Sequence, residues 1–233
     1  MKHIIKQKSP AEFEAWKKFK PRTRFEDLQS SDSKEEGEFD YSTKKLKAEL
    51  LKEQNNLCCY CNAAIKNDHN TTIEHLKPKV GAKNQHLIFD YDNLLASCNG
   101  NRKEPKPRDL HCDAEKDIKL IELTPLMSQC ETKIGYAENG AIFGISNKAK
   151  DTIGKLNLGC AKLTGERSDR IYGKLYKEIV SENSEFDYND PANFERISKQ
   201  EAAKLFNELS KTKSEPYIIA ILQVLKQNFN LKN

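Results

Sequence analysis

The sequence predicts an α+β protein that is mostly helical, with a small core held by cysteines and framed by N-terminal and C-terminal helices. Three observations support this fold class. Apolar residues recur at helical spacing towards both ends of the chain. Short β-branched and apolar runs, which favour strands, occupy the middle. Four spaced cysteines bracket this middle region: Cys58, Cys61, Cys98 and Cys112. The expected boundaries are 1–56 for the N-terminal helical segment, 57–117 for the core and 118–233 for the C-terminal region.

The N-terminal segment is expected to contain two helices separated by a loop. Ser9 is a suitable N-cap and Pro10 suits the first helical position, which predicts a helix to about Phe19. Residues 26–40 are polar and mostly acidic, a composition typical of a mobile, solvated loop. Helical spacing then returns and leads directly to the first cysteine, with apolar positions at Leu46, Leu50 and Leu51.

The core is predicted to consist of short elements. Residues 71–73 favour a strand through β-branching, and residues 86–89 are the expected hairpin partner across a loop at Gly81. A helix is expected to begin at Asp92. The C-terminal region then opens with strands and turns, among which Asn139–Gly140 indicates a hairpin.

Beyond Lys150 the pattern is helical. Helices are expected over residues 153–158 and 163–180, and Ser198 with Glu201 predicts a capping box for the next helix. Pro216 is expected to open the last one. The apolar residues of these helices are spaced for burial, either in the protein's own core or against a partner.

Composition and charge restrict the classes of protein to which this chain can belong. The chain has 233 residues, of which 37% are hydrophobic and 32% are charged, and its net charge is +4. No apolar run is long enough to span a bilayer, and the N-terminus has no signal-peptide pattern, so a cytoplasmic protein without a membrane partner is expected. The mild positive charge does not by itself indicate nucleic-acid binding.

Seven cysteines in a reducing compartment indicate metal binding rather than disulfides. The pair Cys58-x-x-Cys61 suits a zinc knuckle, and Cys98 and Cys112 can complete a closed tetrahedral site for structural Zn²⁺. Either Cys58 or Cys59 could pair with Cys61, and the x-x spacing favours Cys58. The alternatives are buried, unligated thiols or a redox pair. Two further cysteines stand alone and are expected in the core: Cys130 and Cys160.

A Glu–His pair between the cysteines indicates hydrolytic chemistry. Phosphodiester hydrolysis needs a general base, a cation for the phosphate and a group that orients the base. His75 is the candidate base, and Asn93 is placed to fix the turn or the imidazole. Glu74 offers a hard oxygen ligand suited to Mg²⁺ or Mn²⁺. The second ligand is expected near the last core cysteine, at His111 or Asp113, with Asn101 as a weaker candidate.

The order Cys-x-x-Cys, Glu-His-x-x-Pro, Asn-Leu-Leu-x-Ser-Cys and His-Cys-Asp-x-x-Lys resembles the HNH, or ββα-metal, endonucleases with an embedded zinc staple. The resemblance implies that His75 is the general base, that Glu74 is a metal ligand and that Asn93 fixes the loop. In that family the position after the last staple cysteine is His or Asn, but here it is Asp113. This departure leaves His111 as a competing ligand.

The similarity extends beyond the motif. Residues 46–61, 73–79 and 153–158 resemble the PtuB-type HNH proteins of Septu and retron antiphage systems, within a match over about residues 42 to 175. The resemblance implies a PtuA-type partner, which is an ABC/SMC-like ATPase, and in retron-associated members a reverse transcriptase with its msDNA. It also implies a role in defence against phage, with DNA or host tRNA as the nucleic acid that is cleaved.

Basic residues follow the Glu–His pair in sequence and are expected to contact phosphates. They are Lys77, Lys79, Lys83, Arg102, Lys103, Lys106 and Arg108. Alternatively, these residues form a solvated surface that binds no ligand.

Two other classes of function stay open beside the endonuclease. The unusual Asp113 is compatible with a catalytically decayed, zinc-stapled module that binds nucleic acid or serves as an adaptor subunit. A thiol redox switch at Cys58 and Cys61 is the other class, and it leaves the remaining two core cysteines unexplained.

Overall fold

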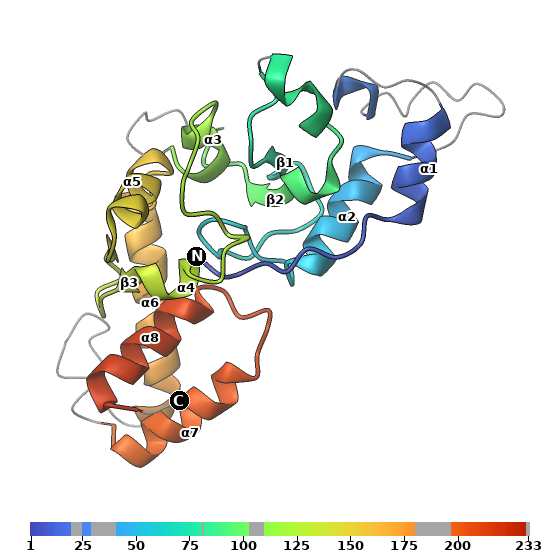
Figure 1. Ribbon diagram of the computed structural model, residues 1–233. Helices are drawn as coiled ribbons and strands as arrows, with labels where there is room; N and C mark the ends of the chain where they lie inside the picture. The colour runs from blue at the N-terminus through green and yellow to red at the C-terminus, as the bar shows by residue number, and fades with distance from the viewer. Residues whose placement is uncertain (20–24, 29–40, 81, 103–109, 180–196, 232–233) are drawn as a thin grey trace.

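The computed structural model describes residues 1–19, 25–28, 41–80, 82–102, 110–179 and 197–231. Over these residues the chain is a mostly helical α+β protein with two small two-stranded antiparallel sheets. Figure 1 shows the sheet β1–β2 between helices α1 and α2 on one side and helix α3 on the other. The C-terminal helices α6, α7 and α8 form a separate group below that sheet in the same view.

The N-terminal frame consists of α1 (Ala11–Phe19), the 3-10 turn η1 (Phe25–Leu28) and α2 (Thr43–Glu53). The first helix confirms the sequence prediction. The second ends before the cysteines, contrary to the expectation that it leads directly to them, because Asn55 and Asn56 adopt left-handed φ values of 55° and 59°. Most of the predicted loop over 26–40 lies outside the described residues.

The core sheet pairs β1 (Thr71–His75) with β2 (Leu94–Cys98), and His75 lies opposite Leu94. The prediction of a partner strand at 86–89 and a helix from Asp92 was therefore wrong. Those residues belong to 3-10 turns or the loop between them, with η2 at Ala82–Leu87 and η3 at Tyr91–Asn93. Leu94, Leu95 and Ala96 are fully buried and β2 contacts both α2 and α3. A strand buried on both faces lacks the alternation that distinguishes it from a helix in sequence.

The segment after the core contains short elements. These are α3 (Cys112–Lys116), α4 (Cys130–Lys133), β3 (Ile134–Tyr136) and β4 (Ile142–Gly144). The predicted hairpin at Asn139–Gly140 is confirmed, since it connects β3 to β4 and Gly140 has a φ of 79°. Helix α4 was not predicted, because its four residues are too few to show helical periodicity.

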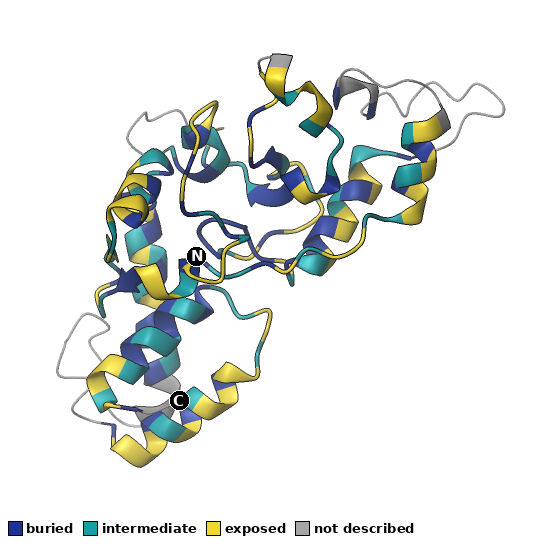
Figure 2. Ribbon diagram, viewed as in Figure 1, coloured by how far each residue is buried: buried dark blue, intermediate teal, exposed yellow. Residues whose placement is uncertain are grey.

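Four helices follow in the described part of the chain: α5 (Asn147–Lys155), α6 (Ala161–Ile179), α7 (Lys199–Ser210) and α8 (Ile218–Phe229). The predicted capping box of Ser198 and Glu201 is present at the start of α7. The first of the four begins earlier than predicted because the Ser146 side chain accepts a hydrogen bond from Ala149 N and caps it. Helix α8 packs against α6, α7 and β3, and α5 packs against β4. Figure 2 shows buried residues along α6 and α8. Among the helices of the described ranges, none combines the length and apolar character needed to cross a membrane.

A buried glutamine joins α2 to the core sheet. The Gln54 side chain is only 4% exposed. Its amide nitrogen donates to Ala96 O at 2.7 Å and Leu57 O at 2.9 Å, and its oxygen accepts from Ala96 N at 2.7 Å. The side chain therefore continues the hydrogen bonding of the sheet where β2 has no third strand beside it.

We expect Gln54→Leu to lower the free energy of unfolding by roughly 2–4 kcal/mol, because Ala96 N–H and Leu57 C=O lose their buried partner. Denaturant unfolding measures this change. The exposed Gln85→Leu is the matched control and is expected to have little effect. Equal stability of the two variants would contradict this account of Gln54.

Candidate functional site

Four cysteine sulfurs meet where three segments of the core converge. Cys58 and Cys61 lie on the turn closed by the Leu57–Ala64 bridge, Cys98 ends β2 and Cys112 begins α3. All four Sγ atoms lie within 4.8 Å of one another. The sulfur of Cys58 is 3.7 Å from that of Cys98 and 4.0 Å from that of Cys112. Tetrahedral ligands at about 2.3 Å from zinc are roughly 3.8 Å apart, so this buried cluster is consistent with structural Zn²⁺.

Backbone and side-chain donors surround the sulfurs, as expected for thiolate ligands. Cys98 N donates to Cys58 Sγ at 3.3 Å, and Ala63 N donates to Cys61 Sγ at 3.4 Å. Cys59 is also buried, but its sulfur is not one of the four. The cluster therefore uses the Cys58 register that the spacing favours.

A pocket of about 500 Å³ borders β1. Its lining includes two carboxylates and a histidine from the core, together with basic side chains from different segments. These residues are Glu74, His75, Asp113, Lys47, Lys79 and Arg102. The sequence-predicted residues Glu74, His75 and Asp113 are therefore gathered around one cavity.

The His75 imidazole is fixed in one orientation at the end of β1. Its Nε2 lies 3.0 Å from Ile88 O, and its ring meets the Phe25 ring edge-on at a centroid distance of 4.7 Å. A carbonyl oxygen can only accept, so Nε2 carries the proton and Nδ1 keeps a lone pair in the neutral ring. Burial lowers the pKa of His75 to about 4, and the nearby charges of Lys79 and Lys116 act in the same direction. The ring is therefore neutral at pH 7.

Asn93 fixes the backbone that follows His75. Its Oδ1 accepts from Lys77 N at 2.8 Å, and its Nδ2 donates to Lys77 O at 3.0 Å and Leu87 O at 3.1 Å. Of the two roles expected for this side chain, holding the turn or holding the imidazole, these contacts serve the turn. The imidazole instead donates from Nε2 to the carbonyl oxygen of Ile88, a contact that the sequence did not predict.

Glu74 is a buried carboxylate in an unusual environment. It is 3% exposed, and its Oε1 contacts Lys116 Nζ at 2.7 Å and accepts from the Tyr60 hydroxyl at 2.9 Å. Burial and the neighbouring Asp113 carboxylate raise the pKa of Glu74 to about 8, although the Lys116 ammonium acts in the opposite direction. Each carboxylate of the pair has one cationic neighbour, Lys116 for Glu74 and Arg102 for Asp113, and at Glu74 burial outweighs the effect of the ammonium.

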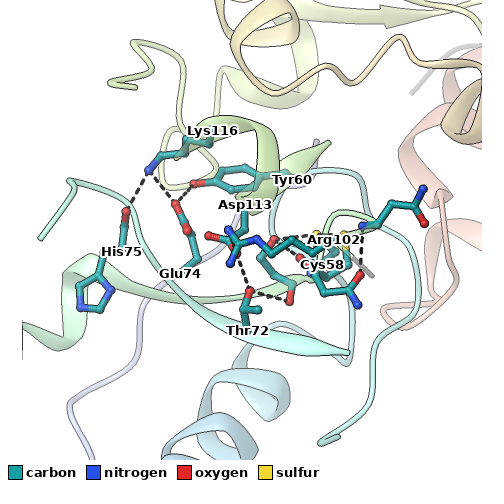
Figure 3. Close-up of polar contacts among 12 residues, drawn as sticks. Cys58, Tyr60, Thr72, Glu74, His75, Arg102, Asp113 and Lys116 are labelled. Atoms are coloured by element: carbon teal, nitrogen blue, oxygen red, sulfur yellow. Dashed lines mark hydrogen bonds and ion pairs between the residues drawn. The ribbon is translucent and has the colours of Figure 1, made fainter. Parts of the chain in front are cut away.

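Asp113 lies on α3 beside Glu74, as Figure 3 shows. Its Oδ2 is 3.1 Å from Arg102 NH2 and accepts from the Thr72 hydroxyl at 3.2 Å. Two neighbouring carboxylates facing a polar pocket are a donor set that suits a hard divalent cation such as Mg²⁺ or Mn²⁺. Glu74 and Asp113 are the residues that can hold such an ion.

The two competing ligands point elsewhere. His111 is buried and its side chain hydrogen-bonds Cys160, a contact that lowers the pKa of this thiol although burial acts to raise it. Asn101 accepts from Lys162 Nζ at 3.4 Å. Neither residue lines the pocket that contains Glu74 and Asp113.

Only some of the basic residues that were predicted to bind phosphate lie at the pocket. Arg102 and Lys79 line the pocket, whereas Lys77 and Lys83 are exposed and do not line it. Three others lie outside the described residues: Lys103, Lys106 and Arg108.

Sequence reasoning missed four side chains at this site. Tyr60 and Lys116 contact Glu74, Phe25 contacts the His75 ring, and Lys47 lines the pocket. Lys47 lies on the same side of α2 as the buried Leu50 and Leu51, one turn before Leu51, so helical spacing gives a partial signal for its position. The contacts of the other three depend on tertiary packing and leave no local signal.

A search against protein-family models finds none that matches the chain, and a search of curated proteins finds no match either. The geometry of the site therefore carries the functional argument.

We expect the purified chain to hold about one equivalent of zinc through the cysteine cluster. Cys98→Ser should lose most of this zinc and unfold at lower temperature, because structural zinc contributes folding free energy. Metal analysis by mass spectrometry, together with thermal unfolding, measures both effects.

The buried neighbour Cys59→Ser is the matched control and should keep its zinc, since its sulfur lies outside the cluster. Zinc loss in Cys59→Ser with retention in Cys98→Ser would show that the ligand set is wrong.

Proposed function

We propose that this protein is a metal-dependent endonuclease of the HNH, or ββα-metal, type. The observation that carries the proposal is that the neutral, oriented imidazole of His75 and the neighbouring carboxylates of Glu74 and Asp113 all line one pocket. The element order supports it, because the antiparallel strands β1 and β2 are followed by α3 as in a ββα unit. The cysteine cluster corresponds to the zinc staple of such proteins.

The residues provide the groups that phosphodiester hydrolysis requires. Nδ1 of His75 can accept a proton from the attacking water because Nε2 is committed to Ile88 O. Glu74 and Asp113 would hold Mg²⁺ or Mn²⁺, which when bound stabilises charge on the phosphate and on the leaving oxygen. Arg102 and Lys79 border the pocket and would neutralise the flanking phosphates.

The proposed biological setting rests on the resemblance to PtuB-type proteins. We infer an antiphage defence complex with a PtuA-type ABC/SMC-like ATPase, joined in retron systems by the reverse transcriptase and its msDNA. The nucleic acid that is cleaved is DNA or host tRNA. The described lining of the pocket includes basic side chains suited to phosphate contacts, which carry no base specificity by themselves.

The proposal predicts that His75→Ala reduces cleavage by roughly 10²–10⁴-fold, because the general base is lost. Cleavage of plasmid DNA, single-stranded DNA and total tRNA is measured in Mg²⁺ or Mn²⁺, with and without a PtuA-type partner. His86→Ala, at an exposed histidine of the same core, is the control and should cleave like the wild type.

Zinc content must be unchanged in both variants, so that loss of activity reports on the base and not on the fold. Wild-type protein that keeps its zinc yet cleaves no substrate under any of these conditions would contradict the endonuclease. It would favour a zinc-stapled nucleic-acid-binding or adaptor subunit.

Cation binding should also depend on pH. The raised pKa of Glu74, about 8, means that the metal-free protein holds a proton that the cation must displace. The affinity for Mn²⁺ is therefore expected to rise as the pH increases towards about 8 and to level off above it. Calorimetry in two buffers of different ionisation enthalpy should show release of close to one proton at pH 7.

Asp117→Asn provides the control for this pH dependence, because Asp117 lines the same pocket but is exposed and is not part of the carboxylate pair. Its Mn²⁺ affinity should follow the wild-type pH profile, whereas Glu74→Gln should abolish tight binding. An affinity for Mn²⁺ that does not change with pH would argue against the buried, protonated Glu74.

A further inference from the structure

Two buried donors converge on a single oxygen of Glu74. The Tyr60 hydroxyl donates to Oε1 at 2.9 Å, and the Lys116 ammonium lies 2.7 Å from the same atom. Lys116 also donates to His75 O at 3.0 Å. Figure 3 shows both side chains pointing at the Glu74 carboxylate, with Asp113 nearby.

Both donors belong to segments that the cysteine cluster holds. Tyr60 lies between Cys58 and Cys61 on the knuckle, and its side chain is completely buried. Lys116 is the last residue of α3, which begins at Cys112, and it is 1% exposed. The surrounding protein leaves these two side chains little freedom to move.

The terminal torsion of a glutamate is intrinsically broad, so a carboxylate without such contacts can turn either oxygen towards a ligand. Here Oε1 is occupied by the hydroxyl and the ammonium, and Lys116 ties this carboxylate to the backbone of His75. The second oxygen, Oε2, is the one that remains for a cation shared with Asp113.

We propose that Tyr60 and Lys116 are positioning residues that hold Oε1 of Glu74, so that Oε2 is presented to a divalent cation shared with Asp113. This inference rests on the proposed function, because it concerns the cation site of the same nuclease. Through these contacts the cysteine cluster sets the geometry of the cation site without any of its sulfurs touching the ion.

The test is the affinity of the zinc-loaded, full-length chain for Mn²⁺, measured by electron paramagnetic resonance without nucleic acid. Tyr60→Phe and Lys116→Met are each expected to weaken Mn²⁺ binding by about 10–100-fold. Lys116→Arg, which keeps a cationic donor, should restore part of the affinity. Zinc content and thermal unfolding are measured on every variant.

Two matched controls separate positioning from general destabilisation. Tyr136→Phe removes a buried hydroxyl whose partner is the N-terminal amine, and Lys6→Met removes a lysine that likewise contacts a buried carboxylate, Glu53, and a backbone carbonyl. Both controls are expected to bind Mn²⁺ like the wild type, even if they unfold at lower temperature.

Cleavage provides a second readout. In Tyr60→Phe the Mn²⁺ concentration needed for half-maximal cleavage should rise, while the rate at saturating Mn²⁺ recovers towards the wild-type value. A purely structural role would lower affinity only in step with zinc loss or unfolding.

The outcomes distinguish the two proposals. In the first outcome the wild type binds Mn²⁺, and the folded, zinc-loaded variants Tyr60→Phe and Lys116→Met bind it with the same affinity. This result overturns the positioning role but does not contradict the endonuclease. Absence of Mn²⁺ binding by the wild type overturns both the cation site and the role of its positioning residues.

Discussion

The convergence of four cysteine sulfurs is the interaction on which the rest of the core depends. A two-stranded sheet is marginal by itself in water, and no third strand joins β1–β2 within the described residues. The sulfurs lie within 4.8 Å of one another and join the knuckle, the end of β2 and the start of α3. A metal ion bound there would connect all three segments, and its binding free energy would add directly to the stability of the core.

Several groups at the candidate site lie on these joined segments or on the strand paired with one of them. The knuckle carries Tyr60, and α3 carries Asp113 and Lys116. Pairing with β2 fixes β1, which ends at Glu74 and His75. Polar side chains complete the frame by bonding to backbone groups, as Asn93 does for the turn after β1. A small core with little regular secondary structure can thus hold the charged side chains of the pocket in place.

The sequence allowed the parts of the site with a local chemical signal to be predicted. The x-x spacing of Cys58 and Cys61 and the adjacency of Glu74 and His75 are such signals. In the rest of the fold, the capping box at the start of α7 is another. The position of β2 was missed because its buried apolar run has no alternation. The contact of Tyr60 with Glu74 was missed because it depends on packing between segments that are distant in sequence.

We propose two distinct metal sites, one in the cysteine cluster and one between the carboxylates of Glu74 and Asp113. The most direct measurement is anomalous diffraction from crystals grown with Mn²⁺, recorded near the zinc and manganese absorption edges. The account predicts a zinc peak within the cysteine cluster and a manganese peak between Oε2 of Glu74 and the Asp113 carboxylate. A zinc peak alone, with no manganese density between the two carboxylates, would contradict it.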